Sequence, residues 1–396
     1  MRTDTLRTGT ARKVKTPVGE ILTFAAVAAL TVIFLITGAR AITGFVSVAD
    51  PNLRYYKAVV TETDDSLLAL PDYGGEREFG LQIVNLRLTE GPFEGRNTVA
   101  RNSVMPDSYV KPSVGDEMIV SVDVRDNGEI YTMLISHYRV PGLLFAIAVF
   151  VLLLIVTCKG KGLRALFGLV FTLVTIFFFT IPRIYEGDSP VFCAIFTSML
   201  TAGVSLLLLN GYTKKTLASV LATFAGFCAA GLIFGVFSAL SNLSGYNAQQ
   251  LGMLSYFAAN SGMRLKYLLF AGVLIASIGA VMDVSMSVAS AVYEVRTADA
   301  SLGVNALFKS GMEVAKDAIG TMSNTLILAF TGGALANLMA LMGYGIQFNR
   351  FINSNYIALE IGQGLSASAA LIVTAPLTSL FAAVIYSGRF VKRDVR

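Results

Sequence analysis

The stretch SIGAVMDVSMSVASAVYEV, residues 277–295, carries a carboxylate, Asp283, inside an apolar run long enough to cross a membrane. In a helix, four polar residues of this stretch recur at i, i+4, i+7 and i+11 and form one narrow stripe: Asp283, Ser287, Ser290 and Glu294. Gly272 and Gly279 extend the stripe with small residues, which let a neighbouring helix approach closely. A charged side chain at the centre of a lipid-facing helix costs about 2.5–3.5 kcal/mol on insertion scales. We therefore predict that the stripe faces protein or water.

The composition assigns the chain to the helical membrane proteins. Of its 396 residues, 54% are hydrophobic and only 14% are charged. In lipid, backbone N–H and C=O groups must find partners within the chain, so the long apolar runs predict a polytopic α-helical protein and exclude a soluble enzyme. The net charge is +5, but residues 45–139 hold 15 of the 26 acidic and only 9 of the 31 basic residues. The positive excess therefore surrounds the membrane spans, which predicts the lipid bilayer as partner and no nucleic acid.

Eight apolar runs predict about eight transmembrane helices. The first run, residues 21–37, follows a short basic segment and predicts a signal anchor, with a cleaved signal peptide as the alternative. Seven further runs follow a long polar segment: 143–157, 166–181, 191–209, 217–240, 267–290, 319–342 and 365–386. The chain thus divides into a basic N-terminus with the first helix (1–44), a polar domain (45–139) and a seven-helix domain (140–396).

The distribution of basic residues predicts how these segments are oriented. Seventeen lysines and arginines fall on one side of the predicted membrane spans, whereas the short flanks on the other side carry five. Because basic residues collect on the cytoplasmic side, both termini are expected in the cytoplasm and residues 45–139 outside the cell. The expected location is the cell membrane.

The polar domain alternates between hydrophobic and polar residues, which predicts β-strands. The clearest element is a hairpin in which residues 118–124 and 129–138 flank an Asp-Asn-Gly turn at 126–128. Earlier strands are predicted at 55–63, 79–89 and 98–104. Five or six short strands favour a small OB-like or SH3-like barrel. Scattered acidic residues predict no metal site, and we find no catalytic constellation in this domain.

Further polar groups accompany the last two spans. Residues 303–318 separate an apolar arc from a charged face and predict an interfacial helix on the inner membrane surface. The next span continues the polar face at i, i+4 and i+7: Asp317, Thr321 and Asn324. This face is expected to lie within hydrogen-bonding reach of Asp283. The last span contributes Glu360 near its outer end and Pro376, which predicts a kink for packing or a polar backbone site.

Three motifs resemble the YibE/F-like family of bacterial membrane proteins. They are GAVMDVSMSVASAVYE at residues 279–294, IGTMSNTLILAF at 319–330 and TAPLTSL at 374–380, and Glu360 accompanies them. The order of one anchor, one extracellular β-domain and seven further spans also resembles that family. The resemblance implies this architecture and is compatible with transport or efflux, and it implies no substrate.

Three classes of function remain. In a transporter or permease, Asp283 couples the movement of an unknown small solute or ion to protons or cations. In a scaffold, sensor or assembly factor, the β-domain binds an extracellular protein partner and no pathway is needed. An intramembrane enzyme is disfavoured, because the one histidine, His137, lies outside the predicted bilayer and only Asp283 lies at depth. No cofactor and no oligomeric state are indicated.

Overall fold

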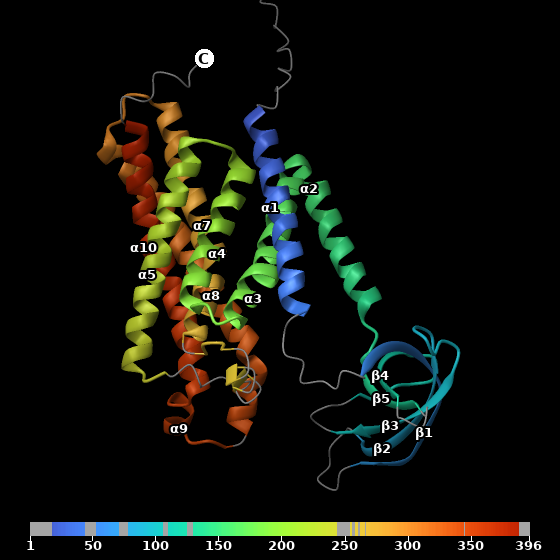
Figure 1. Cartoon of the computed structure of the whole chain (residues 1–396). Helices are drawn as coiled ribbons and strands as arrows, with labels where there is room; N and C mark the ends of the chain where they lie inside the picture. The colour runs from blue at the N-terminus through green and yellow to red at the C-terminus, as the bar shows by residue number, and fades with distance from the viewer. Residues whose placement is uncertain are drawn as a thin grey trace, which may run out of the picture. The chain divides into compact units, whose positions relative to one another are not determined.

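The computed structural model describes residues 18–43, 53–70, 78–105, 110–124, 130–243, 254–255, 258–259, 262–265, 267–343 and 345–387 (Figure 1). The chain forms two compact units, one made of residues 1–46 and 157–396 and the other of residues 47–156. The first unit is a bundle of helices, and the second contains a small β-barrel. The predicted long helices and the predicted small β-barrel are thus both present in the fold.

Five strands close into the barrel in the order β1-β2-β3-β5-β4. Their bounds are β1 Arg54–Ala69, β2 Phe79–Leu88, β3 Asn97–Val104, β4 Glu117–Val124 and β5 Ile130–His137. β3 and β5 pair in parallel and the other neighbours pair antiparallel. A closed five-stranded barrel with this order favours the OB-like alternative. The predicted turn at 126–128 lies outside the described residues.

Alternation along the strands explains the barrel core. Every second residue of a strand points inward. The inward hydrophobic side chains form the buried core of the barrel: Ala58, Val60, Val84, Leu86, Leu88, Ala100, Met118, Val120 and Val122. β1 extends beyond its predicted end to Ala69, with register shifts between Val60 and Glu62 and between Asp64 and Leu67. Such β-bulges bend a strand, which lets β1 pair with β2 and β4 around the closed barrel.

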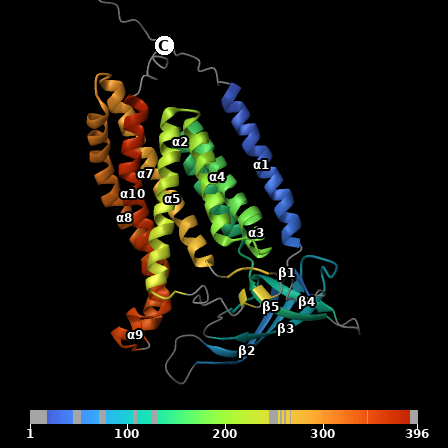
Figure 2. The same cartoon turned by 60° about the vertical axis from the view of Figure 1, so that its left-hand side comes forward.

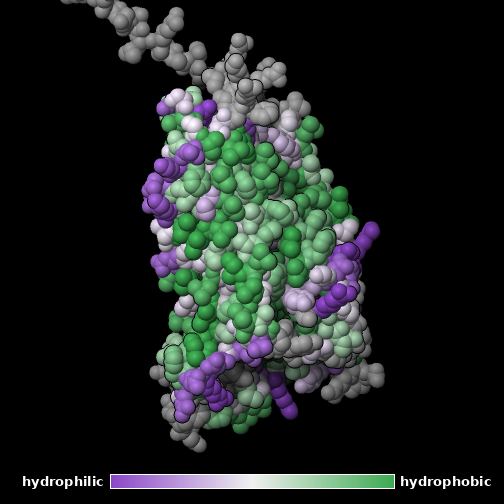
Figure 3. All heavy atoms as spheres, turned by 90° about the vertical axis from the view of Figure 1, so that its left-hand side faces the viewer, coloured by the Kyte–Doolittle hydropathy of each residue, from purple (hydrophilic) through white to green (hydrophobic). Residues whose placement is uncertain are grey.

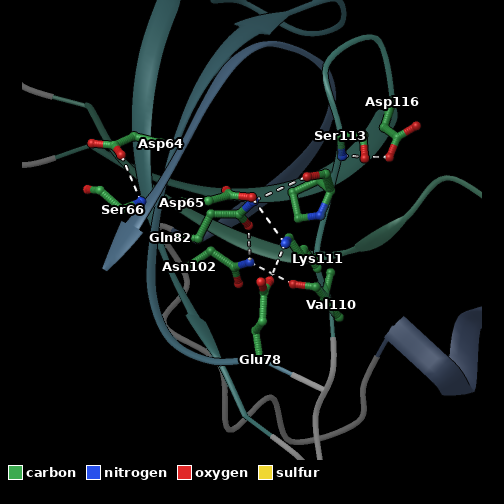
Figure 4. A network of polar contacts seen from close by, with 11 residues as sticks. Asp64, Asp65, Ser66, Glu78, Gln82, Asn102, Val110, Lys111, Ser113 and Asp116 are labelled. Atoms are coloured by element: carbon green, nitrogen blue, oxygen red, sulfur yellow. Dashed lines mark hydrogen bonds and ion pairs between the residues drawn. The ribbon is translucent and has the colours of Figure 1, made fainter. Parts of the chain in front are cut away.

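Two buried amides tie one end of the barrel together (Figure 4). Gln82 is fully buried, and its Nε2 donates hydrogen bonds to Asp65 Oδ1 at 2.8 Å and to the carbonyl of Pro112 at 3.2 Å. Asn102 Nδ2 donates to Gln82 Oε1 at 3.0 Å and to the carbonyl of Val110 at 2.6 Å. These bonds hold the segment before β4 against β2 and β3, and they satisfy polar groups that would otherwise destabilise the core.

An ion-pair cluster sits beside these amides. Lys111 Nζ bonds to Glu78 and lies 3.1 Å from Asp65 Oδ2. The hydrogen bond to Glu78, followed by that to Asp65, raises the pKa of Lys111 above its ordinary value. A raised lysine pKa contributes stability that is present below the unfolded-state pKa and is lost as the pH rises through the folded-state value. Lys111 therefore stays charged throughout the neutral range.

Among the residues that the structure describes, seven helical stretches are long and apolar enough to cross a membrane, which indicates a multi-pass membrane protein. The helices are α1 Val18–Thr43, α2 Val140–Thr175, α3 Ile181–Tyr185, α4 Pro190–Asn210, α5 Lys214–Leu240, α7 Leu268–Ala298, α8 Val304–Gly343, α9 Phe348–Ile352 and α10 Asn355–Ser387. The start of α1 and the end of α10 lie at the same end of the bundle (Figures 1 and 2). Hydrophobic side chains cover most of the helical surface seen in Figure 3.

Two of the eight predicted spans share one helical stretch. α2, the π-helix η1 Ile176–Thr180 and α3 follow one another directly over 46 residues, Val140–Tyr185. If straight, this stretch would measure about 69 Å, more than twice the thickness of a bilayer core. At Lys159, however, the backbone is non-helical, with φ 49° and ψ −128°. The bend lies in the polar sequence Lys-Gly-Lys-Gly at 159–162, between the two predicted apolar runs.

The prediction of a separate interfacial helix at residues 303–318 is wrong. Residues 303–318 and the following span form one continuous 40-residue helix, α8. The apolar arc packs within the bundle, where Leu307, Gly311 and Ala315 are buried against α7 and α10. An amphipathic pattern shows which face is apolar, and that face can be covered equally well by lipid or by a helix. No proline follows Ala318 within α8, and Gly320 is itself helical, so the helix continues.

Small residues allow close packing around α10. A Cβ placed on Gly226 of α5 would collide with the side chain of Thr374 on α10 and lie 2.9 Å from Val281 on α7. A Cβ on Gly311 of α8 would lie 2.7 Å from Val292 and 2.9 Å from the hydroxyl of Ser379. The backbones approach closely at both points, which is typical of helix packing in membranes.

We expect residues 45–139 to fold alone into a β-protein with a two-state unfolding transition, because the barrel has its own core. In that domain Gln82→Leu should lower the free energy of unfolding by about 1–3 kcal/mol, since the amide of Asn102 then loses its buried acceptor. Urea unfolding followed by circular dichroism measures both effects. Asn85→Leu on the same strand is the control, because Asn85 binds Glu62 at an exposed position. Equal losses in both variants would contradict the role given to Gln82.

Gly226→Val is expected to destabilise the full-length protein by about 1–3 kcal/mol, because the added side chain overpacks the contact with Thr374 and Val281. Gly272→Val makes the same exchange at a position with no described atom within 4 Å and should change stability much less. Thermal unfolding in detergent compares the two proteins. A larger loss for Gly272→Val would overturn the helix packing described above.

Candidate functional site

The predicted polar stripe forms the uncovered face of α7. The opposite face is buried, through Leu274, Ser277, Val281, Val284, Ser285, Val288, Ala289 and Val292. Gly272, Gly279, Asp283, Ser287 and Glu294 are exposed, and Ser290 is half-buried. The sequence therefore predicted correctly which residues share this face. No described atom lies within 4 Å of a Cβ built on Gly272 or Gly279, so these glycines make no close helix contact with the described part of the chain.

Asp283 occupies the midpoint of α7. Fifteen helical residues precede it and fifteen follow it. No hydrogen bond or ion pair joins its carboxylate to another described residue. α7 is about 46 Å long at the ordinary helical rise, so its midpoint is far from both ends. An ionisable residue at this depth is rare in membrane proteins and marks a functional site by default.

A groove of about 340 Å³ lies beside the stripe, between α2, α4 and α7. Its α7 wall includes Gly279 and Met282, the residues one turn before Asp283 and directly before it. The other walls supply the hydroxyl groups of Thr172, Thr201 and Ser205. Thr172 and Thr201 donate their hydroxyls to helix carbonyls one turn earlier, at 2.9 and 2.7 Å. The groove thus offers a mostly apolar space whose walls carry three hydroxyl groups and the cationic side chain of Arg164, within one turn of Asp283 along α7.

The second polar stripe faces a different direction. Asp317, Thr321 and Asn324 of α8 are all exposed, and Thr321 Oγ1 donates to the carbonyl of Asp317 at 3.1 Å. α8 contacts α7 through another face. There Ala315 and Ile319 of α8 pack against Val284 and Val288 of α7. The same cluster includes Ala280 of α7 and three further residues of α8: Met312, Met322 and Leu326. Adjacent packing of α7 and α8 is confirmed. The expected hydrogen bond from this stripe to Asp283 is absent among the described residues. The two helices pack through their apolar faces, which leaves both polar stripes outside the contact.

Hydroxyl groups also join α5 and α7, a contact that the sequence analysis did not predict. Thr223 Oγ1 and Ser285 Oγ lie 2.9 Å apart, and Ser219 Oγ donates to the carbonyl of Ser285 at 3.2 Å. All three residues are buried. The spacing of Ser219 and Thr223, one helical turn apart, is the signal that could have predicted this polar seam.

α10 carries the remaining predicted residues. The helix continues through Pro376 without interruption from Asn355 to Ser387. Glu360 is half-buried and lines a second cavity, which is formed by α8, α9 and α10. The hydroxyl of Tyr356, one turn earlier, hydrogen-bonds to the Glu360 carboxylate. Asn337 Nδ2 of α8 donates to that same hydroxyl oxygen at 2.9 Å. Glu360 and Asp283 therefore belong to separate sites.

The long apolar helices and the five-stranded barrel of the described chain indicate a helical multi-pass membrane protein with a small β-barrel. The profile of the YibE/F-like protein family matches residues 146–388, more than half of the chain. The chain therefore belongs to the YibE/F-like family, as its motifs suggested. No curated protein and no solved structure matches it.

A pair of neighbouring serines tests which face of α7 is accessible. After replacement of the three cysteines by alanine, we expect the Ser287→Cys variant to react with a water-soluble maleimide at least ten times faster than the Ser285→Cys variant. Ser287 is exposed, whereas Ser285 is fully buried against Thr223. The reaction requires a thiolate in contact with water. Labelling in reconstituted membranes measures both rates, and equal protection of the two thiols would show that the stripe is covered.

Proposed function

We propose that this protein is a transporter or permease, coupled to protons or cations through Asp283. The observation that supports this function is a carboxylate at the midpoint of a membrane-length helix, on a face that the described chain leaves uncovered. Transporter sites for substrates and coupling ions commonly lie near the bilayer midplane. The groove lined by Gly279 and Met282 gives a solute room within one helical turn of that carboxylate along α7.

The coupling follows from the charge of Asp283. In a low-dielectric layer a carboxylate is stable when it holds a proton, pairs with a cation or contacts water. Changing between these states links the occupancy of the site to a proton or cation gradient. Ser287, Ser290 and Glu294 continue the same face toward the end of α7, where they offer oxygen atoms to a positive species. Glu294 lies about 16 Å along the helix from Asp283.

The orientation is part of this proposal. The bend of α2 and the connection between α4 and α5 lie at the same end of the bundle as the start of α1 and the end of α10 (Figures 1 and 2). Both segments are basic, with Lys159 and Lys161 in the bend and Lys214 at the start of α5. Basic residues at one end support placing that end, with both termini, in the cytoplasm of a cell and the barrel outside.

Asp283→Asn is the decisive substitution for transport. Asparagine has nearly the same shape and remains neutral, so folding should be retained and thermal stability unchanged or higher. Gradient-driven flux of cations in proteoliposomes should fall to background, because the site no longer exchanges a proton. Metal cations and organic cations are screened first with the parent protein.

Glu313→Gln is the matched control, because Glu313 is exposed and paired with Lys316 at 2.7 Å. We expect it to retain parental flux. Full flux in the Asp283→Asn protein, measured on a preparation of equal thermal stability, would rule out coupling through Asp283.

A second function is favoured by one surface of the barrel. Tyr131, Met133 and Ile135 form an exposed apolar row along β5, with 44%, 49% and 45% of their surfaces accessible. Contiguous exposed apolar side chains commonly mark a protein interaction site. A scaffold, sensor or assembly factor would bind an extracellular protein there and carry no solute. Absence of gradient-dependent flux for every screened solute in the parent protein would favour this function.

A further inference from the structure

The cavity between α8, α9 and α10 has an almost wholly apolar lining. Its volume is about 370 Å³, within the range of sites that hold small organic molecules. Phe330 and Leu338 of α8, Phe351 of α9 and Ile357 and Ile361 of α10 supply most of the wall. Glu360 is the only ionisable residue among the described residues that line it. The cavity shares no lining residue with the groove beside Asp283.

Glu360 is held in place by a short polar chain. Asn337 Nδ2 donates to the hydroxyl oxygen of Tyr356 at 2.9 Å, so the hydroxyl proton of Tyr356 is directed elsewhere. That hydroxyl hydrogen-bonds to the Glu360 carboxylate one turn along α10. A carboxylate has about four acceptor positions, and this bond uses one. The remaining positions are free to accept from a ligand.

No described cation neutralises this carboxylate. No ion pair joins Glu360 to a lysine or arginine of the described chain, and its described polar partner is Tyr356. A negative group in an apolar wall attracts a positive charge and repels an anionic one. Phe330 and Phe351 add aromatic rings to the same wall, and aromatic faces also attract cations.

The same lining discriminates among cations. A metal ion requires several oxygen ligands, whereas this cavity offers one carboxylate and the hydroxyl of Thr331. An organic cation with an apolar body needs one counter-charge, and it gains free energy by burying its apolar surface. We propose that this cavity binds a monovalent lipophilic organic cation, with Glu360 as its counter-charge. The site does not depend on transport through Asp283.

Tetraphenylphosphonium is a suitable probe, because its charge is permanent and its body is apolar. We expect the purified full-length protein in nanodiscs to bind the radiolabelled cation saturably, and Glu360→Gln to weaken binding at least tenfold. Triphenylphosphine oxide, an uncharged phosphorus compound with similar aryl groups, should compete equally weakly in both proteins. Thermal unfolding verifies that the Gln variant is folded.

Further variants separate this site from its alternatives. Thr331→Phe should block the cavity from its exposed rim and abolish binding while Glu360 is unchanged. Asp283→Asn and Glu313→Gln should bind as the parent does, so failure of the transport proposal leaves this one intact. Parental affinity in Glu360→Gln, or no saturable binding by the parent, would overturn the inference.

Discussion

Close approach of helix backbones determines which surfaces of the bundle remain available. Gly226 brings α5 against α10 and α7, and Gly311 brings α8 against α7 and α10. Side chains with a Cβ would hold these helices apart, and the loss of dispersion contacts would not be compensated, because lipid supplies no hydrophobic force between helices. α7 therefore uses its apolar face for packing. Its polar face is left exposed, and Asp283 lies in the middle of it.

The two carboxylates, Asp283 and Glu360, differ in how they are held. Glu360 accepts a hydrogen bond from Tyr356, which is itself fixed by Asn337 on another helix. A group held on two helices has a defined orientation and suits the recognition of one ligand shape. Asp283 makes no such bond with a described residue. Its carboxylate is free to exchange partners, which is the property that a coupling group requires and a fixed binding group lacks.

Periodicity in the sequence predicted which residues share a face, and it did not predict what covers that face. The strands of the barrel followed from the alternation of hydrophobic and polar residues. The stripe from Gly272 to Glu294 likewise appeared as one face of α7. The predicted contact between Asp283 and the Thr321 face was wrong, because the sequence does not show which faces of two helices pack together. Residues 303–318 show the same ambiguity, since their apolar arc packs on α7 and α10 and does not lie on lipid.

The Glu360 site was predictable only in part. Tyr356 and Glu360 are one turn apart, so their contact follows from the sequence, but Asn337 and the cavity walls come from tertiary structure. The feature that indicates a ligand is the set of hydrogen-bond acceptor positions on the Glu360 carboxylate that no described donor uses. A purely structural acid within a bilayer is expected to have a cationic partner or a full set of donors, because an unpaired charge there is costly. Glu360 has one described donor and an apolar cavity in front of it, and a lipophilic cation supplies both the missing charge and the missing apolar contacts.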